Sequence, residues 1–322
     1  AVSTFACAFA QSYWQLLVFR AAGGIGSTMF TVSAMALLVR LAPPRLRGRA
    51  SGYFSAGFLI GSLTGPLLGA ALVGGGLALP FIVYAAALVV ATILVATLMP
   101  ASPAVTVPHD ATPEAPVVAI TFREALHDNA YRAILASNFA QGWASMGVRI
   151  ALVPLFVTQD LGQSDAWAGF VLACYAAGNM IAILTAGRLS DHYGRRPVLV
   201  PGLVVAAVAT LALGFSPNIW WALMLTAVAG LGSGLFAPTH QAALGDVLGM
   251  RQRGGSALAA YGMASDLGAV IGPLAAGAVA TYWGFAPAFL LTGGVLVVAL
   301  GLWAVARETL PDHGEEPEPV TP

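Results

Sequence analysis

The sequence predicts an all-α membrane protein that crosses a lipid bilayer many times. Three observations support this fold class: 58% of the 322 residues are hydrophobic, only 9% are charged, and the mean hydropathy is +0.81. An ordinary soluble domain carries roughly 25% charged residues, which cover its water-facing surface. Because this chain has so few, we expect most of its surface to face lipid.

Charge and cysteine content exclude several other classes. The formal net charge is zero, which does not suggest a nucleic-acid or acidic partner. Cys7 and Cys174 both lie in apolar runs, which favours buried thiols over a disulfide or a metal site. No basic segment precedes the first apolar run, so we do not expect a secretory signal peptide, and from the abrupt start within hydrophobic sequence we expect a truncated chain.

Apolar runs follow one another along the chain. The first, 1–12, is too short to span a bilayer, which takes about 20 helical residues, whereas nine others are long enough or nearly so. The nine predicted spans are 14–39, 50–72, 80–99, 131–159, 166–186, 198–213, 218–248, 255–280 and 284–305.

Arginines are confined to alternate connections between these spans. Of the fourteen basic residues, all of them Arg, twelve lie in one set of loops or in the span ends that flank them, whereas Arg20 and Arg149 lie further inside spans. By the positive-inside rule that set is cytoplasmic, and the C-terminus with it. The opposite connections, near 73–79, 160–165, 214–217 and 281–283, carry no arginine.

A proline-rich stretch separates two halves of the chain. Thr121 and Glu124 follow it with the spacing of a capping box that opens a short helix. We therefore predict a first bundle at 1–99, from a partial third span to the sixth, a cytoplasmic linker at 100–130 and a six-helix bundle at 131–306. An acidic, proline-containing tail at 307–322 is expected to be disordered.

The second half repeats the first at an offset of 206 or 207 residues. The tetrapeptide at 24–27 recurs at 230–233, and Gly65-Pro66-Leu67 recurs as Gly272-Pro273-Leu274. At this offset the counterpart of the connection 187–197 would precede residue 1. We expect the parent protein to carry roughly two and a half more helices, giving a six-plus-six arrangement.

The densest group of charges lies in the connection 187–197, which we expect to be a tight loop at a membrane surface. Its glycines permit sharp turns, its aspartate can cap the following helix, and its arginines can bridge carboxylates or helix carbonyl ends. These residue types alone leave open whether the loop only fixes topology or takes part in function. The residues concerned are Gly187, Leu189, Asp191, Gly194, Arg195 and Arg196.

The string GRLSDHYGRR at 187–196 resembles the loop signature of the major facilitator superfamily of secondary transporters, G-x-L-[ST]-D-x-[FY]-G-R-[RK]. The resemblance covers essentially the whole chain and implies two six-helix bundles that rock about a central site. It also implies that Asp191, Arg195 and Arg196 hold the cytoplasmic side against a neighbouring helix end, for which 255–280 is a candidate.

Glycines recur every four residues in the predicted span 50–72, with a proline beside the third. Small residues at this spacing let helices pack closely, and proline can kink a helix, so plain packing would also explain them. The pattern resembles the fifth-span signature of drug and proton antiporters of the superfamily, except that Ala70 replaces the usual second glycine. The set is Gly57, Gly61, Gly65, Pro66 and Gly69, with Gly268, Gly272, Pro273 and Gly277 as its second-half counterpart.

Four ionisable residues within predicted spans are candidates for proton coupling or substrate binding: Arg20, Arg149, Asp266 and His240. Arg20 and Gly24 resemble the fourth-span R-x-x-x-G motif that the family associates with proton coupling, but a long side chain could also snorkel to water. His240 could titrate near neutral pH, or pack beside a proline kink.

Asp266 falls near the bilayer midplane, where an unpaired carboxylate is costly. It could be a coupling or substrate carboxylate, an ion-pair partner of Arg149 or of another helix, or a neutral packing residue. Trp143 and Tyr175 could line a cavity, and Gln141 could hydrogen-bond a substrate, but packing roles explain all three as well.

These observations predict a secondary active transporter in the inner or plasma membrane. The resemblance favours a proton-coupled exporter of a small amphipathic compound. Alternatives are an importer of a sugar, carboxylate or other metabolite, and a non-transporting sensor. A polytopic membrane enzyme would need paired carboxylates or a clustered His/Asp set, and neither is found. The expected partners are lipid, a small-molecule substrate and protons; the expected form is a monomer without metal or cofactor.

Overall fold

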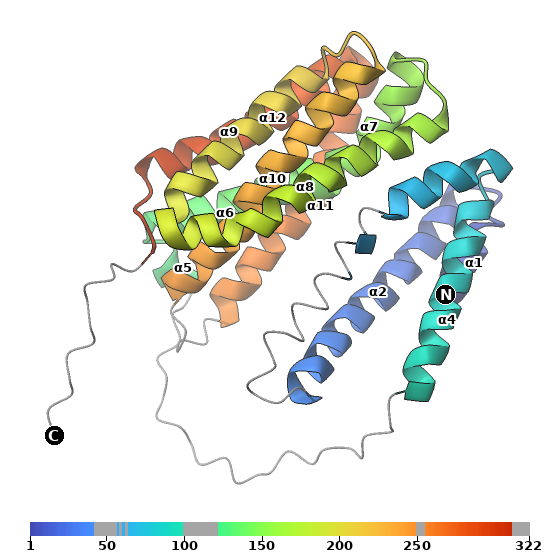
Figure 1. Ribbon diagram of the computed structural model, residues 1–322, viewed down its shortest axis with the longest axis horizontal. Helices are drawn as coiled ribbons and strands as arrows, with labels where there is room; N and C mark the ends of the chain where they lie inside the picture. Colours follow the sequence, from blue (N-terminus) through green and yellow to red (C-terminus); the bar gives the residue numbers. More distant parts are fainter. Residues whose placement is uncertain (42–56, 58–59, 62–63, 99–121, 249–254, 311–322) are drawn as a thin grey trace, which may run out of the picture. The chain divides into compact units, whose positions relative to one another are not determined.

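The computed structural model describes residues 1–41, 57, 60–61, 64–98, 122–248 and 255–310. The described residues form helices and short connections and contain no β-strand, as expected for an all-α protein. The chain divides into two units, Ala1–Thr112 (unit 1) and Pro113–Pro322 (unit 2), each with its own internal packing (Figure 1).

Unit 1 contains α1 (Val2–Cys7), α2 (Tyr13–Leu41), a helical segment at 64–72, the short η2 (Val73–Gly75) and α4 (Leu79–Leu98). The short α1 packs against α2 and α4. The predicted spans 14–39 and 80–99 are each a single helix. About half of the predicted span 50–72 lies outside the described residues, as do the loop residues 42–49 and the proline-rich stretch.

Unit 2 begins with the short helix predicted after residue 121, α5 (Phe122–Ala125). A continuous rod of 32 residues, Asn129–Asp160, follows. It comprises α6 (Asn129–Gln141), the π-helical η3 (Gly142–Val148), α7 (Arg149–Leu155) and the π-helical η4 (Phe156–Asp160). Five further long helices complete the unit: α8 (Asp165–Tyr193), α9 (Arg195–Leu213), α10 (Ile219–Leu248), α11 (Gly255–Trp283) and α12 (Phe285–Val305).

Seven described helices are long and apolar enough to cross a membrane. They are α4, the rod Asn129–Asp160 and α8 to α12, and they correspond to the last seven predicted spans. Many large apolar side chains on these helices point outward, such as Leu184, Val208 and Val298. An outward apolar face suits a helix whose surroundings are lipid, because lipid replaces water as its solvent.

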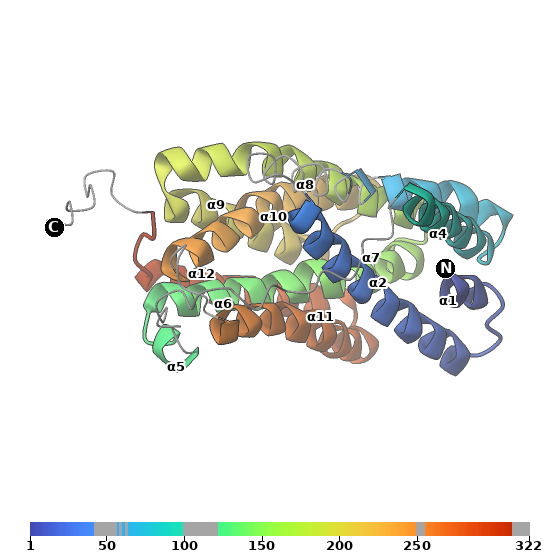
Figure 2. The same ribbon diagram turned by 90° about the horizontal axis from the view of Figure 1, so that it is seen from below.

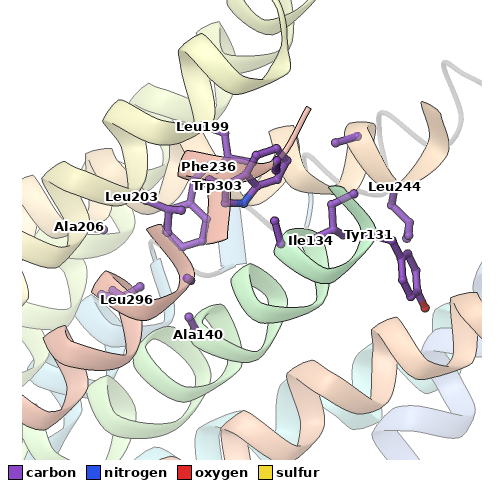
Figure 3. Packing of buried hydrophobic residues seen from close by; sticks show 14 of the residues in the cluster. Tyr131, Ile134, Ala140, Leu199, Leu203, Ala206, Phe236, Leu244, Leu296 and Trp303 are labelled. Atoms are coloured by element: carbon purple, nitrogen blue, oxygen red, sulfur yellow. The ribbon is translucent and has the colours of Figure 1, made fainter. Parts of the chain in front are cut away.

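The core of unit 2 is packed from helices that are far apart in sequence. One cluster of buried apolar side chains joins the rod to α9, α10 and α12 (Figure 3). The Trp303 indole in this cluster is fully buried, and its Nε1 donates to Ser137 Oγ at 2.7 Å. The labelled members are Tyr131, Ile134, Ala140, Leu199, Leu203, Ala206, Phe236, Leu244, Leu296 and Trp303.

The rod and α11 lie side by side (Figure 2) and approach closely through glycine. A Cβ at Gly142 would lie 1.9 Å from the carbonyl oxygen of Ser265, and one at Gly268 would lie 2.2 Å from that of Phe139. Only a residue without a side chain fits such contacts. Gly272, a predicted packing residue, faces Trp143 in the same way, with a Cβ approach of 3.0 Å.

The predicted loop over 187–197 is wrong in its extent. Helix α8 continues to Tyr193 and α9 begins at Arg195, so the connection is the single residue Gly194, whose φ is 101°. A helical backbone satisfies its own hydrogen bonds. The charged residues can therefore continue α8 and begin α9 while their side chains remain available for polar contacts. Asp191 lies inside α8, where it cannot cap α9 as expected.

The chain beyond α12 also differs from the prediction. Glu308 accepts hydrogen bonds from four backbone N–H groups and Thr309 is 6% exposed, so residues 307–310 are ordered and the disordered tail was placed too early. Residues 311–322 lie outside the described part of the chain.

Candidate functional site

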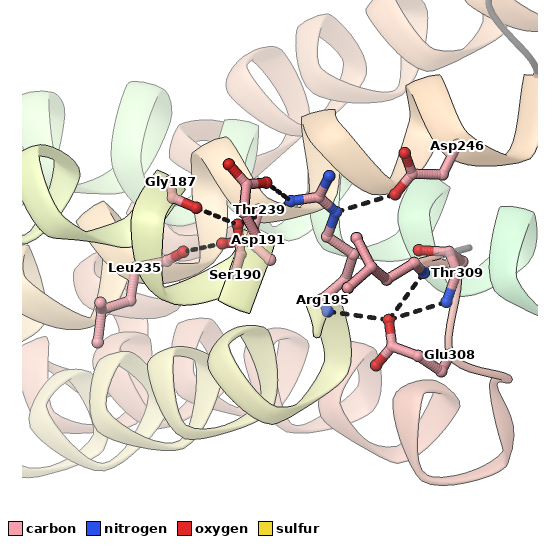
Figure 4. Close-up of polar contacts among 10 residues, drawn as sticks. Gly187, Ser190, Asp191, Arg195, Leu235, Thr239, Asp246, Glu308 and Thr309 are labelled. Carbon is pink, nitrogen blue, oxygen red and sulfur yellow. Dashed lines mark hydrogen bonds and ion pairs between the residues drawn. The ribbon is translucent and has the colours of Figure 1, made fainter. Parts of the chain in front are cut away.

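One polar cluster is centred on Arg195, at the first position of α9 (Figure 4). The Arg195 side chain is only 10% exposed, and its Nε donates to Asp246 Oδ2 of α10 at 2.9 Å. Its Nη1 donates to Ser190 Oγ at 2.9 Å and to the Asp191 carboxylate, both on α8. The guanidinium thus joins the ends of three helices. We call Ser190, Asp191, Arg195, Asp246 and Glu308 the Arg195 cluster.

Glu308 supplies the cap of α9 that the sequence suggested for Asp191. Its Oε1 accepts from the Arg195 backbone N–H at 2.9 Å, and its Oε2 accepts from that of Arg196 at 3.0 Å. The φ of 101° favours glycine at position 194, and a Cβ there would lie 2.9 Å from Glu308 Oε2, so a larger residue would push the capping carboxylate aside. A carboxylate also suits the positive end of a helix dipole.

The electrostatics of Glu308 follow from this position. Burial alone would raise the pKa of its carboxyl, but the four backbone N–H donors of Leu310, Arg195, Arg196 and Thr309 outweigh burial and hold the pKa below its ordinary value. Glu308 is therefore ionised at neutral pH, and its carboxylate caps α9 within the Arg195 cluster.

The resemblance implied that Asp191, Arg195 and Arg196 contact a neighbouring helix end, and the end of 255–280 was one candidate. The described contacts go instead to Asp246 near the end of α10 and to the segment after α12, where Arg196 Nη2 donates to the Ala304 carbonyl oxygen at 2.8 Å. A second ion pair, between Arg307 Nη2 and Asp128 Oδ2 at 2.6 Å, ties the start of the rod to the same end of the unit.

A second polar cluster lies inside unit 2, around Arg149. This residue begins α7 directly after the π-helical η3, and π-helical turns are frequent at functional sites. Its guanidinium donates to the Ser145 carbonyl oxygen of its own helix and lies over the Tyr175 ring of α8, 3.0 Å from the ring centroid. Such a cation–π contact partly offsets the cost of desolvating the charge.

Hydroxyl groups from three helices surround this arginine. Ser145 Oγ is 2.9 Å from Tyr175 Oη and 3.3 Å from Ser233 Oγ of α10. Ser233 Oγ in turn donates to Gln141 Oε1 at 3.1 Å. We call Gln141, Ser145, Arg149, Tyr175 and Ser233 the Arg149 cluster. Tyr175 and Gln141, for which packing was the preferred explanation from the sequence, take part in a polar network.

A small cavity of about 40 Å³ borders this cluster, within unit 2. Its wall combines the Arg149 side chain with hydroxyl-bearing and apolar residues of the rod, α8, α9, α10 and α12. Thr226 is 2% exposed, lines the cavity, and has no hydrogen-bond partner for its Oγ1. A buried hydroxyl without a partner is costly, which distinguishes Thr226 from Ser145 and Ser233, whose hydroxyls are paired.

His240 is buried in α10, 2% exposed, and is not part of the wall of this cavity. Its Nδ1 is 3.0 Å from Tyr261 Oη of α11, whose backbone carbonyl oxygen accepts from Asn138 Nδ2 at 2.6 Å. His240 therefore joins two neighbouring helices, which agrees with the packing alternative; its Nε2 has no partner in the described structure.

Asp266 and Arg20 are exposed and make no hydrogen bond or ion pair within the described residues. The structure does not contain the alternative ion pair between Asp266 and Arg149. Ser265 faces Gly142, and Arg149 lies seven residues beyond Gly142 on the rod, about 10 Å of helical rise.

The glycine and proline residues predicted as a packing motif separate into two groups. No described atom of unit 1 lies within 4 Å of a Cβ built at Gly57, Gly61, Gly65 or Gly69, and Pro66 lies in the helical segment 64–72. In α11, by contrast, Gly272 faces Trp143, and Pro273 lies against Gly147 of η3. Close packing is thus observed for Gly268, Gly272 and Pro273 of the second-half set but not for Gly277, beside which a Cβ would meet no neighbouring atom within 4 Å.

Sequence reasoning missed Ser145, Ser233 and Thr226 as site residues. Two signals were present: Ser233 ends the repeated tetrapeptide, and Thr226 occupies the position that corresponds to Arg20 in the repeat. Neither signal was sufficient, because hydroxyl side chains in a helix commonly bond to their own backbone.

The fold and the two clusters define an all-α, multi-pass membrane protein with a polar site inside a helix bundle. The sequence model of the Major Facilitator Superfamily matches residues 1–152 and 134–322, which together cover the chain. The chain belongs to this superfamily, as the string at 187–196 predicted.

Curated relatives match about half of the chain. The Multidrug resistance protein MdtG of Salmonella typhi is 32% identical over 159 residues, 48% of this chain and 39% of the relative. MdtG of Citrobacter koseri is 33% identical over the same shares. The matched region therefore spans about two fifths of these relatives.

Solved structures show the same fold. A bacterial homologue of the human lysosomal transporter Spinster, inward-facing and unoccupied, has a TM-score of 0.75 at 16% identity over 94% of this chain and 79% of that chain. The peptide transporter POT in complex with sulfate has a TM-score of 0.51 at 20% identity, over 55% of this chain and 37% of that chain. The predicted superfamily fold is confirmed.

Proposed function

We propose that the protein is a secondary active transporter that exports a small amphipathic compound in exchange for protons by alternating access. It does so as a monomer in the bacterial inner membrane, with the Arg195 cluster and the C-terminus at the cytoplasmic face. The family, the multidrug resistance proteins among its relatives and the resemblance of 57–69 to the antiporter signature support this proposal.

The observation that carries the proposal is the Arg195 cluster. In this cluster, residues of the string at 187–196 form contacts that connect the ends of α8, α9 and α10 with the segment after α12. Asp191 is 69% exposed and Asp246 is 17% exposed, so the Arg195–Asp191 pair is the part that can exchange with water or another helix end. A contact that opens and reforms at one end is what a rocking transporter requires.

The test uses inverted membrane vesicles from cells that express this chain. Export then becomes uptake of a fluorescent amphipathic dye, measured with an imposed pH gradient and after its collapse by an ionophore. We expect gradient-dependent uptake that falls severalfold in Asp191→Asn, at unchanged membrane abundance. Asp165→Asn, an exposed acid at the other end of α8, is the matched control.

Two results would contradict the proposal. Uptake that is independent of the gradient would exclude proton antiport and favour facilitated transport. Dye uptake at the wild-type rate in Asp191→Asn would restrict the string at 187–196 to a role in topology.

A further inference from the structure

Arg149 carries a charge inside a membrane-spanning rod without an acidic partner. The ion pairs among the described residues involve Arg195 and Arg307 but not Arg149. Its contacts are a carbonyl oxygen of its own helix and the face of Tyr175. A guanidinium presents five N–H donors, so most of its hydrogen-bonding capacity is unused in the described structure.

The carboxylates among the described residues do not complete this site. Asp110 is the first acidic residue of the printed sequence. Asp160 and Asp165 are exposed at the ends of their helices, and Asp246 is bound by Arg195. Asp266, near the middle of α11, is about two turns away along the rod.

The cavity beside Arg149 is suited to a small polar group. Its volume of about 40 Å³ exceeds the roughly 10–15 Å³ that one water needs, but it is too small for a drug-sized molecule. Thr226 Oγ1, buried and without a partner, belongs to its wall, as do Ser145 and Ser233. The remaining wall is apolar, including Val153 and Phe289, which keeps the local dielectric low and strengthens interactions with charge.

We propose that Arg149 and Thr226 bind the anionic head group, a carboxylate or sulfonate, of the transported compound, while its apolar body stays outside the cavity. This inference rests on the proposed transport function and specifies its substrate class. Arg149 supplies charge-assisted hydrogen bonds in a planar geometry that matches a carboxylate. Tyr175 fixes the guanidinium plane, and Thr226 donates its free hydroxyl.

The test measures binding rather than flux, with three probes of one shape. These are 2-naphthoate, 2-naphthalenemethanol and 2-naphthylmethylamine, which share a ring and differ in head-group charge. Binding to the purified chain in lipid nanodiscs is followed by calorimetry. We expect 2-naphthoate to bind at least about tenfold more tightly than the alcohol, since hydrogen bonds to charged groups are the stronger ones. The amine should bind most weakly.

Variants of Arg149 and Thr226 test whether these two residues cause the preference for 2-naphthoate over the alcohol. Arg149→Gln should reduce 2-naphthoate affinity to that of the alcohol, and Arg149→Lys should retain part of the preference because it keeps the charge. Thr226→Val should weaken 2-naphthoate severalfold with no loss in Tm, because it removes a hydroxyl that has no partner in the empty protein. Arg132→Gln and Thr185→Val, outside the cavity wall, should bind like wild type.

Equal affinity for 2-naphthoate and the alcohol would overturn the inference, and so would full 2-naphthoate binding in Arg149→Gln. If that variant fails to fold, Arg149→Lys and Thr226→Val decide the question. Displacement of 2-naphthoate by millimolar chloride as effectively as by acetate would show a general small-anion site and overturn the head-group assignment.

The vesicle assay separates this inference from the proposed function. Gradient-driven uptake of the cationic dye ethidium without 2-naphthoate binding would remove the anionic substrate class and leave transport intact. Binding of 2-naphthoate without uptake of any probe would support the site and contradict transport by this chain.

Discussion

Two arginines in unit 2, Arg195 and Arg149, are held in opposite ways. Arg195 donates to two carboxylates and a hydroxyl at one end of the unit, where α8, α9 and α10 meet. Arg149 lies within the bundle beside a cavity, with an aromatic ring and a carbonyl oxygen as its contacts. Arg195 therefore has two carboxylate partners, whereas Arg149 has none among the described residues.

The difference distinguishes a charge that connects helix ends from a charge that has donors available for a ligand. A desolvated charge is costly unless other groups compensate for it, and within a membrane an incompletely compensated one is by default a candidate for substrate or ion binding. Arg195 should therefore contribute more to stability than Arg149, and Arg149 should contribute more to ligand binding. The predictions below test that separation, beginning with the largest expected effect.

The largest effect on stability is expected for Arg195→Met. This change leaves Asp246, 17% exposed, without its main partner and also removes the bonds to Ser190 and Asp191. Breaking a largely buried ion pair typically costs about 3–5 kcal/mol, and we expect the lower value for the partly exposed carboxylate. The free energy of unfolding by denaturant in mixed micelles measures the loss.

Arg149→Met is the matched control for that prediction. The substitution keeps an unbranched side chain of similar length and leaves no carboxylate without its partner. The loss in the free energy of unfolding should therefore be below about 1 kcal/mol. Equal losses in the two variants would contradict the distinction between the two arginines.

The next effect concerns the π-helical η3, which precedes Arg149. Gly142→Ala would place a Cβ 1.9 Å from the Ser265 carbonyl oxygen, so α11 and the rod must separate. Overpacking of this kind costs about 1–3 kcal/mol. Gly277→Ala in α11, where no described atom lies within 4 Å of the new Cβ, should be neutral or slightly stabilising. Unfolding of both variants checks this, and similar values for both would contradict the observed packing.

The sequence predicted the helices well because their signal is distributed over many residues. Each of the last seven predicted spans appears as a helix that is long and apolar enough to cross a bilayer, and most ends agree within a few residues. The largest error was at 187–197, where charged residues continue α8 and α9 instead of forming a loop. The charged residues end the apolar stretch that can span the membrane, but they do not end the helix.

The site was predicted less well because it depends on contacts between distant residues. Arg149 and Tyr175 stood out as single residues in apolar runs, whereas Ser145, Ser233 and Thr226 are ordinary helix residues until packing brings them to one cavity. Likewise Glu308 was assigned to a disordered tail, since nothing local indicates that it caps α9 from 113 positions away.

A smaller, pH-dependent effect is expected for Glu308→Gln. The folded-state pKa of Glu308 lies below its ordinary value, so its contribution is complete above the ordinary glutamate pKa of about 4.3 and is lost as pH falls through the lowered folded-state pKa. At neutral pH the variant should lose about 1 kcal/mol, as for loss of a helix cap. Measured between pH 7 and 3, the difference from wild type should shrink toward the acid end; a constant difference would contradict the carboxylate's role.

The smallest effect is expected for Arg307→Gln, which removes the ion pair with Asp128. Arg307 is 61% exposed in its side chain, and exposed pairs typically contribute about 0–1 kcal/mol. Burial alone would raise the pKa of Asp128, but Arg307 and the backbone N–H of Ala130 together lower it. Asp128 keeps its bond to Ala130 N, 2.8 Å long, in the variant, so the helix cap persists. If Arg307→Gln lowered the free energy of unfolding as much as Arg195→Met, exposure would not distinguish the ion pairs at this end of unit 2. The contrast between Arg195 and Arg149 would then lose its physical basis.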